Sequence, residues 1–420
     1  MKYLFENLHN AGGGRVSLAV SDGIFVDPTE ATSDWRRIDG GGLTVVPGLV
    51  DLHTHLREPG KEDAETVLTG SRAAVAGGYT AISAMPNTNP VADTAGVVEQ
   101  VFRLGKSHGI CDVFPIGAVT LGQQGKALSE MGAMNQSEAK VRIFSDDGHC
   151  VWDSLVMRRA LEYVKSFDGL IAQHAQDPRL TQGSQMNEGE VSALLGLKGW
   201  PAAAEESIIA RDILLNEHVG SRLHICHLTT AGGVELIRWA KKRGIEVTAE
   251  VTPHHLLLTD ELARSYDPVY KVNPPLRTER DVLALREGVA DGTIDVIATD
   301  HAPHPAEDKE CEWAAAAFGM IGLETALSVS YKALVESGMM SFENLIERMS
   351  VAPARIGRYE GHGSLEVGSE ANFTLLDLAA NWRVDDGEIR SKSKNSPYIG
   401  MELPVTVKRT YLRGKEVFAG

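Results

Sequence analysis

The chain has 420 residues, of which 43% are apolar and 23% charged, and its 57 acidic and 41 basic side chains give a formal net charge of −16. This composition is that of an ordinary globular protein and excludes a largely disordered chain, while the length allows two or three domains or one large barrel with an appendage. The acidic excess argues against nucleic acid or an anionic membrane as the main partner, because both are bound through clustered Lys and Arg.

The two ends of the chain have the same character. Residues 1–50 contain short segments rich in Val and Thr, such as RVSLAVSDGIFV, and residues 359–420 contain similar segments, such as ANFTLLDL and VTVKRTYL. Each piece alone is too small to bury a good core. Because chain termini often lie close together, we expect residues 1–50 and 359–420 to combine into one smaller β-sandwich domain.

Residues 51–358 repeat one theme: an apolar run, a polar residue where the run ends, and a stretch with helical spacing of apolar positions. Eight such runs can be counted, and they end near His53, Asn87, Thr120, Asp146–Asp147, His174, His227, His254 and Asp300. Helices are predicted over residues 64–76, 97–108, 155–164, 204–216, 234–242 and 280–289.

Eight strand–helix units predict an α/β fold, a (β/α)8 barrel of the TIM type, with its active site at the C-terminal ends of the strands. Continuous apolar strands that alternate with helices are typical of a parallel sheet covered on its outer face. The alternative is an open doubly wound sheet, which also binds ligands at strand ends. It is less favoured because the chain has no GxGxxG at the first strand–helix turn.

The strongest local signal for function is VDLHTHLR at residues 50–57. Alternate residues of a strand face the same way, so His53 and His55 lie on one face, two positions apart. Two imidazoles placed like this can share one metal ion. By itself, however, one HxH pair is at least as readily explained as ordinary polar residues at a strand end.

Histidines and aspartates at the other strand ends favour the metal hypothesis. Asp147, His174, His227 and Asp300 each stand where a predicted strand ends. The HxH pair with Asp300 would form one site, the other two histidines a second, and a carboxylate can bridge the two. Imidazole and carboxylate ligands without Cys suit a catalytic zinc with open positions for water and substrate.

The motifs PGLVDLHTHLREPG, MPNTNP, FSDDG, EVTPHHL, NPPLR and ATDHAPH follow one another along the chain. Together they resemble the successive motifs of the cyclic amidohydrolases, and among these the long bacterial dihydroorotases. The resemblance spans residues 45–325 and extends to GSLEVGSEANFTLLD and LRGKEV near the C-terminus. It implies the reversible zinc-dependent cyclisation of N-carbamoyl-L-aspartate to L-dihydroorotate plus water, a step of pyrimidine (UMP) biosynthesis.

The resemblance also implies two zinc ions per subunit. The implied metal ligands are His53, His55, Asp147, His174, His227 and Asp300. Asp300 would in addition act as general base and acid toward a metal-bridging hydroxide. Asp147 is the expected bridging ligand, with Asp146 as the alternative. Many relatives carry a carboxylated lysine at the bridging place, but this chain has no lysine there, so we expect no lysine carbamate.

Substrate contacts are implied by the same motifs. They are His55, Arg57, Asn87, Asn273, His304, Phe318 and Gly319. Arg57, Asn87 and His304 would hold the free carboxylate of the substrate, because a guanidinium fork matches a carboxylate. Asn273 and the backbone at residues 318–319 would contact the ring amides. The alternative for Arg57 is a surface ion pair.

Three rival functions share part of this pattern. A hydantoinase, dihydropyrimidinase or allantoinase would share the fold and the metals, but Arg57 favours a ring that bears a carboxylate. Inactive dihydroorotase-like scaffolds that bind aspartate transcarbamoylase have lost metal ligands, whereas this chain keeps them. A metal-storage protein would leave Asp300 without a purpose. A homodimer and an association with aspartate transcarbamoylase stay open, and no nucleic-acid or membrane partner is expected.

The expected location is the cytoplasm. No apolar run approaches the roughly 18 residues that a bilayer span needs, and the first residues lack the apolar stretch and cleavage site of a secretory signal. The four cysteines are far apart and form no CxxC pair. Free thiols in a cytosolic protein are the natural interpretation.

Several neighbours of the motifs are expected to stand outside the metal site. His224 and Cys226 differ in strand parity from His227, so we expect His224 to pack behind the site and Cys226 to lie on the other face. Histidines outside the motifs, among them His362, are expected to face solvent. Residues 305–319, PAEDKECEWAAAAFG, are interpreted as a loop that could close over substrate or as a plain solvated connection.

Overall fold

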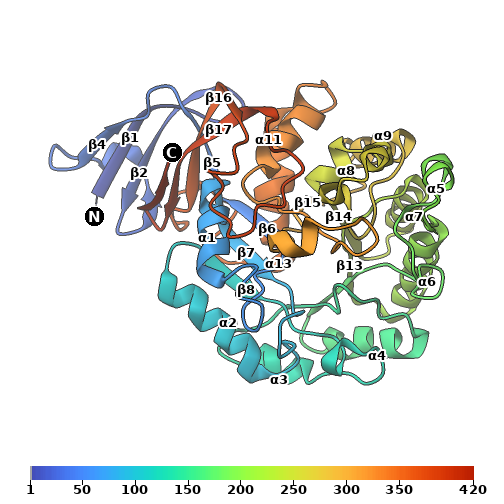
Figure 1. Cartoon of the computed structure of the whole chain (residues 1–420). Helices are drawn as coiled ribbons and strands as arrows, with labels where there is room; N and C mark the ends of the chain where they lie inside the picture. The colour runs from blue at the N-terminus through green and yellow to red at the C-terminus, as the bar shows by residue number, and fades with distance from the viewer. Residues whose placement is uncertain (1) are drawn as a thin grey trace.

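The structure, a computed structural model, describes residues 2–420 and consists of a barrel with a sheet-rich part beside it (Figure 1). Both chain ends lie in the sheet-rich part. Its strands are β1 (Lys2–His9), β2 (Arg15–Ser21), β3 (Ile24–Val26), β4 (Arg36–Asp39), β5 (Thr44–Pro47), β16 (Phe373–Arg383), β17 (Glu402–Leu412) and β18 (Lys415–Ala419). They form one sheet in the order β18-β17-β16-β5-β1-β2-β3, with β4 beside β1, so the two termini pair as expected.

The barrel contains the eight predicted strands. They are β6 (Leu49–Thr54), β7 (Tyr79–Ala84), β8 (Asp112–Pro115), β9 (Ile143–Phe144), β10 (Leu170–Gln173), β13 (Arg222–Ile225), β14 (Val247–Val251) and β15 (Val296–Ile297). Neighbouring strands pair in parallel. The parallel bridges Gly117–Phe144 and Thr54–His301 join the two groups of strands into a closed ring. The predicted (β/α)8 barrel is therefore confirmed and the open sheet is wrong.

The six predicted helices are present with small shifts of their ends. They are α1 (Val67–Ala76), α2 (Ala95–His108), α4 (Ser154–Lys165), α6 (Ala203–Val219), α7 (Ala231–Lys242) and α9 (Glu279–Ala290). Helix α1 begins after residue 64 because the side chain of Thr66 accepts the N–H of Thr69 and caps the helix. The division of the chain into 1–50, 51–358 and 359–420 stays a prediction; β6 begins two residues before the second of these segments.

Shorter elements fill the connections. They are α3 (Met131–Gln136), α5 (Glu190–Leu195), α8 (Pro253–Leu257), α10 (Ala306–Lys309), α11 (Ala326–Ser330), α12 (Phe342–Ile346), α13 (Ala352–Gly357), β11 (Met186–Asn187), β12 (Gly199–Trp200), 3₁₀ turns at Pro28–Glu30, Leu121–Gln123, Asp260–Ser265 and Pro268–Tyr270, and π-helical turns at Tyr331–Val335 and Glu347–Val351.

The core explains why the site opens at one end of the barrel only. Inward-facing residues such as Leu52, Ala172 and Ala298 form one buried cluster with residues of α13 and with Tyr359. Helix α13 thus packs against the bottom of the barrel and closes it. Outward-facing strand residues pack against the helices in a second, larger cluster. The polar strand ends are left at the opposite, C-terminal mouth, where TIM-type barrels carry their sites.

Two further observations concern the molecule as a whole. His362, expected in solvent, is buried: its ring contacts Thr80 Oγ1 at 3.1 Å and donates to Asp112 Oδ2 at 3.0 Å. That expectation was wrong because the segment after α13 folds back onto β8. None of the helices formed by residues 2–420 combines the length and apolarity that a bilayer span requires.

Candidate metal centre and substrate site

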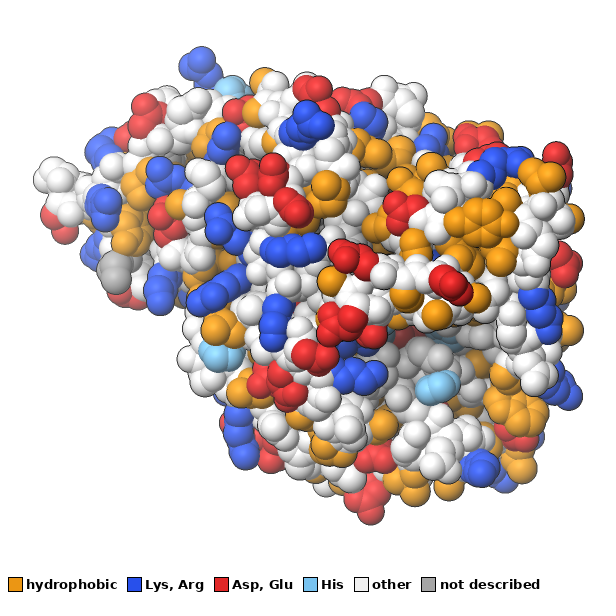
Figure 2. Space-filling view, viewed as in Figure 1, with side chains coloured by type: hydrophobic (Ala, Val, Ile, Leu, Met, Phe, Trp, Pro, Cys, Tyr) orange, Lys and Arg blue, Asp and Glu red, His pale blue; other side chains and the backbone are white. Residues whose placement is uncertain are grey.

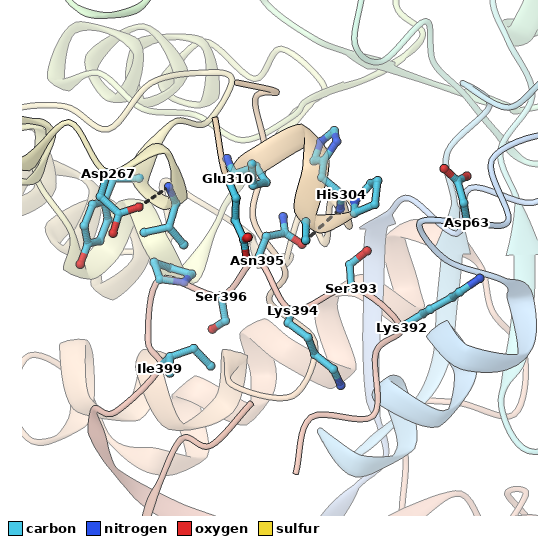
Figure 3. A pocket seen from close by; sticks show the side chains of 16 residues that line it. Asp63, Asp267, His304, Glu310, Lys392, Ser393, Lys394, Asn395, Ser396 and Ile399 are labelled. Atoms are coloured by element: carbon cyan, nitrogen blue, oxygen red, sulfur yellow. Dashed lines mark hydrogen bonds between the residues drawn. The ribbon is translucent and has the colours of Figure 1, made fainter. Parts of the chain in front are cut away.

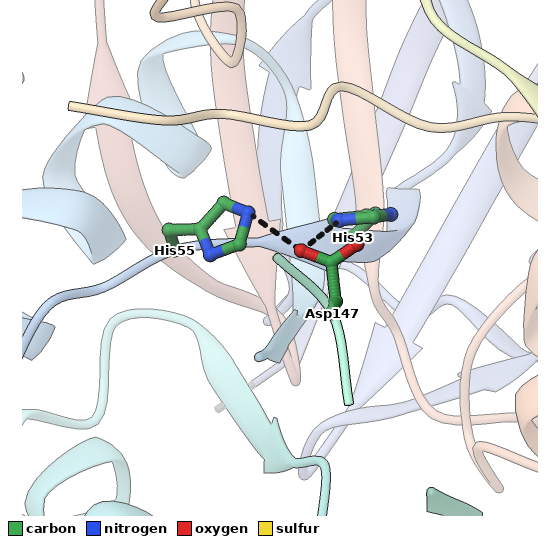
Figure 4. A group of neighbouring side chains, drawn as sticks. All are labelled: His53, His55 and Asp147. Atoms are coloured by element: carbon green, nitrogen blue, oxygen red, sulfur yellow. Dashed lines mark ion pairs between the residues drawn. The ribbon is translucent and has the colours of Figure 1, made fainter. Parts of the chain in front are cut away.

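The HxH pair lies at the end of β6 and is buried, with His53 at 0% and His55 at 4% exposure. Both imidazoles point toward the carboxylate of Asp147, which follows β9 (Figure 4). Their Nε2 atoms each lie 3.4 Å from Asp147 Oδ2. The parity argument for two imidazoles on one face therefore holds in the structure.

The second histidine pair faces the other oxygen of Asp147. His174 Nδ1 and His227 Nε2 lie 3.1 and 3.2 Å from Asp147 Oδ1, and these two nitrogens are 2.9 Å apart. Asp146, the alternative, instead accepts the N–H groups of Val119 and Thr120 and the hydroxyl of Thr120. Of the two aspartates, only Asp147 has one oxygen toward each pair of histidines.

Asp300 completes the cluster at the end of the last barrel strand. Its Oδ1 lies 3.0 Å from His55 Nε2 and 3.5 Å from His53 Nε2. Its backbone has a φ of 46°, a left-handed conformation that non-glycine residues adopt uncommonly and that is frequent at functional sites. The six predicted ligands are thus brought together from five strand ends.

The electrostatics of the cluster favour a cation. Burial alone would raise the pKa of Asp147, but His53 and hydrogen bonds from the second histidine pair outweigh burial and hold that pKa well below its usual value. Burial also raises the pKa of Asp300, and His53 and His55 reverse this and lower it. Conversely, burial lowers the pKa of His53, yet the surrounding carboxylates raise it well above its usual value. The carboxylates around His53 thus favour positive charge in this pocket, and a metal ion would supply that charge once the imidazoles have lost their protons.

The outer nitrogen of three imidazoles is fixed by an acceptor. His53 Nδ1 donates to Glu250 Oε1 at 2.6 Å, and His55 Nδ1 donates to Asn87 Oδ1 at 2.9 Å. His174 Nε2 donates likewise to Gln176 Oε1 at 2.7 Å. Each bond leaves the opposite nitrogen, with its lone pair, directed at the cluster, as metal-ligating histidines require.

Glu250, in β14, was not predicted from the sequence. Its second oxygen accepts Nε2–H of His224 at 3.0 Å, so His224 packs behind the site as expected. The available signal was a glutamate within the apolar run VTAEV, because buried carboxylates are rare unless they are paired. Gln176, the other missed residue, stands in a polar loop and gave no such signal.

Cys226 corrects one expectation. It belongs to the inward-facing cluster of the barrel, and its Sγ forms a compact group with a ring nitrogen of His53 and a carboxylate oxygen of Glu250. The parity argument was wrong because β13 ends at Ile225 and His227 has a φ of 31°, so side chains no longer alternate there.

The residues present fit a metal centre. His53, His55 and Asp147 form one group whose possible ligand atoms all lie within 4.8 Å of one another, and Asp147, His174 and His227 form another. The buried Nε2 of His53 has no hydrogen-bond partner within residues 2–420. A buried polar atom without a partner is unfavourable, and a metal ion would give it one.

The predicted carboxylate clamp lies beside this cluster. Arg57 is buried, its Nε donates to Pro303 O at 3.1 Å, and its NH2 lies 3.4 Å from His304 Nε2. Burial lowers the pKa of Arg57 to about 10, so the guanidinium stays charged at neutral pH. Burial, helped by Arg57, lowers the pKa of His304 to about 3, so that imidazole is neutral. The alternative of a surface ion pair for Arg57 is wrong.

Phe318 and Gly319 are held close to the clamp. His304 Nε2 donates to Phe318 O at 2.9 Å. Gly319 has a φ of 143°, and a Cβ there would lie 2.8 Å from His304 Nε2, so only glycine fits. Asn273 approaches the second histidine pair through Gln176, with Nδ2 3.5 Å from Gln176 Oε1, and its own Oδ1 is buried without a partner in the described part of the chain.

Residues 305–319 are tied down by two buried lysines. Lys271 Nζ donates to the carbonyls of Trp313 and Ala316 at 2.6 and 2.7 Å. Lys309 Nζ donates to Ala317 O and Gly319 O, both at 2.9 Å.

A cavity of about 550 Å³ opens beside His304 and is also lined by residues 392–397 (Figure 3). On the face of the molecule seen in Figure 2, acidic, basic and hydrophobic side chains are mixed around a hollow.

Comparisons with known proteins agree with this geometry. A family model described as Dihydro-orotase-like matches residues 42–232, and one described as Amidohydrolase family matches residues 202–417. The dihydroorotase of Streptomyces coelicolor is 64% identical over 96% of this chain and 95% of that protein. The dihydroorotase of Mycobacterium tuberculosis is 54% identical over 99% and 98%.

Among solved structures, the L-hydantoinase of Arthrobacter aurescens superposes with a TM-score of 0.88 at 28% identity, covering 99% of this chain and 95% of that one. The dihydropyrimidinase of Brevibacillus agri has a TM-score of 0.85 at 19% identity, with 100% and 95% coverage, and shares the fold. Fold, motif order and sequence identity agree, and the chain belongs to the dihydroorotase family of the amidohydrolases.

Proposed function

We propose that the protein is a dihydroorotase that interconverts N-carbamoyl-L-aspartate and L-dihydroorotate plus water in pyrimidine biosynthesis. The observation that carries the proposal is the position of a charged, buried Arg57 next to a cluster in which the two oxygens of Asp147 face two histidine pairs. The cluster suits amide hydrolysis, and the guanidinium suits a substrate with a free carboxylate.

The proposed metals are two zinc ions. His53, His55 and Asp300 would hold one, His174 and His227 the other, and Asp147 would bridge them. When bound, zinc lowers the pKa of water and polarises an amide carbonyl. The chain supplies a carboxylate at the bridging place, so we propose that no carboxylated lysine is used.

Asp300 is the proposed general base and acid. Its carboxylate is ionised at neutral pH, because its pKa is lowered. In ring opening, Asp300 would take a proton from the attacking water and deliver it to the departing ring nitrogen. In ring closure the same side chain would carry the proton in the opposite direction, as microscopic reversibility requires.

Substrate orientation is assigned to the clamp. Arg57 and Asn87 would bind the free carboxylate, and so would His304 through the Nε2–H that it shares with Phe318 O. Asn273 and the backbone of Phe318 and Gly319 would contact the ring amides. His55 would also contact substrate from the metal side. Because the net charge of −16 repels an anionic substrate at long range, local cations have to attract it.

A hydantoinase activity is the second candidate, since the L-hydantoinase structure shares the whole fold. Purified protein reconstituted with zinc, without added bicarbonate, should turn over L-dihydroorotate and not hydantoin.

Asp300→Ala should abolish turnover with the fold retained, as judged by circular dichroism. Arg57→Met should raise KM for N-carbamoyl-L-aspartate by roughly 10- to 100-fold, because a charge-assisted bidentate contact is lost.

The outcomes of this assay separate the candidates. Turnover of hydantoin at the rate of dihydroorotate would favour the hydantoinase. An unchanged KM in Arg57→Met would contradict the clamp, and an active Asp300→Ala would contradict its role. We further propose a cytoplasmic location. Whether the protein forms a homodimer, and whether it associates with aspartate transcarbamoylase, can be tested by measuring its molar mass by light scattering with and without that enzyme.

A further inference from the structure

Residues 384–401 join β16 to β17 and reach from the terminal sheet to the mouth of the barrel. Two carboxylates of the barrel part, the buried Glu65 and the half-buried Glu324, hold this segment. Glu324 accepts the N–H groups of Arg390 and Ser391 at 2.9 and 3.1 Å, and Glu65 accepts the hydroxyl of Ser391. The segment is therefore docked onto the barrel by specific hydrogen bonds and does not simply cross solvent.

Asn395 is the residue of this segment that reaches the clamp. Its Oδ1 accepts the backbone N–H of His304 at 3.1 Å (Figure 3), and its Nδ2 donates to the carbonyls of Ala302 and Gly319 at 3.0 and 3.2 Å. Its own carbonyl accepts the N–H of Ile321 at 3.1 Å. The side chain is only 7% exposed, and its oxygen and its nitrogen are both paired.

These bonds join two stretches of backbone that carry the clamp. Residues 302–304 lead to His304, and residues 319–321 begin with Gly319. The two stretches are closely packed, because a single added Cβ at Gly319 would collide with the imidazole of His304. Asn395 fixes the spacing between these stretches at the point where they meet.

We propose that Asn395 is a positioning residue for the substrate clamp, acting through the backbone of His304 and Gly319. The inference rests on the proposed function, since it takes those two residues to contact substrate. A displacement of binding groups by a fraction of an ångström to one ångström weakens catalysis and binding strongly. Loss of Asn395 should therefore appear in substrate binding and not only in stability.

Asn216 provides a matched control. It is buried as well, its Nδ2 donates to the carbonyls of Ser221 and Glu246, and its Oδ1 accepts the N–H of Ser221. The same three kinds of bond thus occur at the other end of the barrel, where β13 and β14 begin. Asn216→Ala and Asn395→Ala remove the same chemistry, one far from the clamp and one beside it.

The test compares both variants in zinc-reconstituted protein, with metal content and melting temperature measured alongside kinetics. Asn395→Ala should raise KM for N-carbamoyl-L-aspartate by roughly 10-fold while kcat changes by less than about 3-fold, because binding is lost and Asp300 is untouched. Asn216→Ala should lower the melting temperature with KM within about 2-fold of the wild type. Equal KM values for the two variants would overturn the proposal.

A double-mutant cycle checks the route of the effect. In a His304→Ala background, Asn395→Ala should raise KM by clearly less than 10-fold further, because residues that act through one another are not additive and only the part that runs through Gly319 is left. A full 10-fold rise in that background would refute action through His304. If the wild type itself does not turn over N-carbamoyl-L-aspartate, the proposed function fails; if it does and the two asparagine variants match, only the role of Asn395 fails.

Discussion

Glu250 lies behind the proposed metal ligands and contacts three of the histidines around the site. It accepts His53 Nδ1–H and His224 Nε2–H, and its Oε1 lies 3.4 Å from the backbone nitrogen of His227. Burial alone would raise the pKa of Glu250, but the charge of His53 and the two imidazole bonds lower it far below its usual value. The carboxylate is therefore ionised, and it both orients His53 and adds negative charge next to the cluster.

Replacing this charge should loosen the metal without removing a ligand. Glu250→Gln is expected to weaken zinc affinity by roughly 10- to 100-fold, because partners behind a ligating histidine fix its orientation and basicity. Competition with a fluorescent chelator measures this. Glu205→Gln is the control, since Glu205 is a buried carboxylate that accepts bonds from Thr229 and Thr230 instead of from imidazoles. Equal zinc affinity in Glu250→Gln and the wild type would contradict the role.

At the scale of single residues, the sequence predicted which side chains form the cluster but did not predict which residues hydrogen-bond to its histidines. His53 and His55 could be predicted because motif and strand parity both pointed to them, and Asp147 could be predicted from its motif. Cys226 was placed on the wrong face because parity ends with the strand. Glu250 is the first residue of the motif EVTPHHL, but nothing in that motif shows that its side chain contacts His53. Gln176 belongs to none of the motifs.

At the scale of elements, strands and helices of the barrel were predictable because each repeats an apolar run and an amphipathic stretch. The segment at residues 384–401 was not, since its polar composition is that of any surface loop. Single long-range hydrogen bonds dock this segment onto the barrel. Glu324 accepts the backbone N–H groups of Arg390 and Ser391, and Asn395 accepts the backbone N–H of His304. Such bonds have no local signature in the sequence.

The docking by Glu324 should depend on pH. Burial raises the pKa of Glu324 to about 7, although hydrogen bonds from the backbone of residues 390 and 391 oppose it. Between about pH 4.5 and 7 the unfolded chain has lost this proton and the folded chain keeps it, so stability falls as pH rises through that window. Glutamine can still accept the same N–H groups but does not titrate.

Glu324→Gln is therefore expected to be about 1–3 kcal/mol more stable than the wild type at pH 8, with a much smaller difference near pH 5. Urea unfolding at the two pH values measures the change. Glu336→Gln, at an exposed position, serves as control and should follow the wild type at both. A constant offset between Glu324→Gln and the wild type from pH 5 to pH 8 would show that Glu324 is not the titrating group.

For the whole molecule, the terminal sheet and the barrel are joined at several places besides residues 384–401. Thr410 Oγ1 donates to Val75 O at 2.7 Å, and Thr374 Oγ1 donates to Gly78 O at 2.8 Å, so strands β16 and β17 sit against the end of α1. Arg413 pairs with Asp112 of β8 at 2.7 Å. A barrel strand, a barrel helix and the mouth are thus all linked to the sheet that both termini build.

The proposed metal ligands span the barrel in the same way, since His53 and Asp300 follow its first and last strands. The site that these residues form exists only in the folded barrel, so a cation that binds there should stabilise the whole molecule by mass action. At a hundredfold excess over the dissociation constant each site would add about 2.7 kcal/mol, and zinc should raise the melting temperature by roughly 5 °C or more. Calorimetry with zinc and with a chelator measures the difference.

Asp147→Asn should lose at least half of this rise in melting temperature, because the residue that faces both histidine pairs no longer bears a charge. Mg²⁺ should leave the melting temperature of the wild type unchanged, because Mg²⁺ prefers oxygen ligands. Identical melting of the wild type in zinc and in chelator would mean that the gathered imidazoles and carboxylates do not hold a metal.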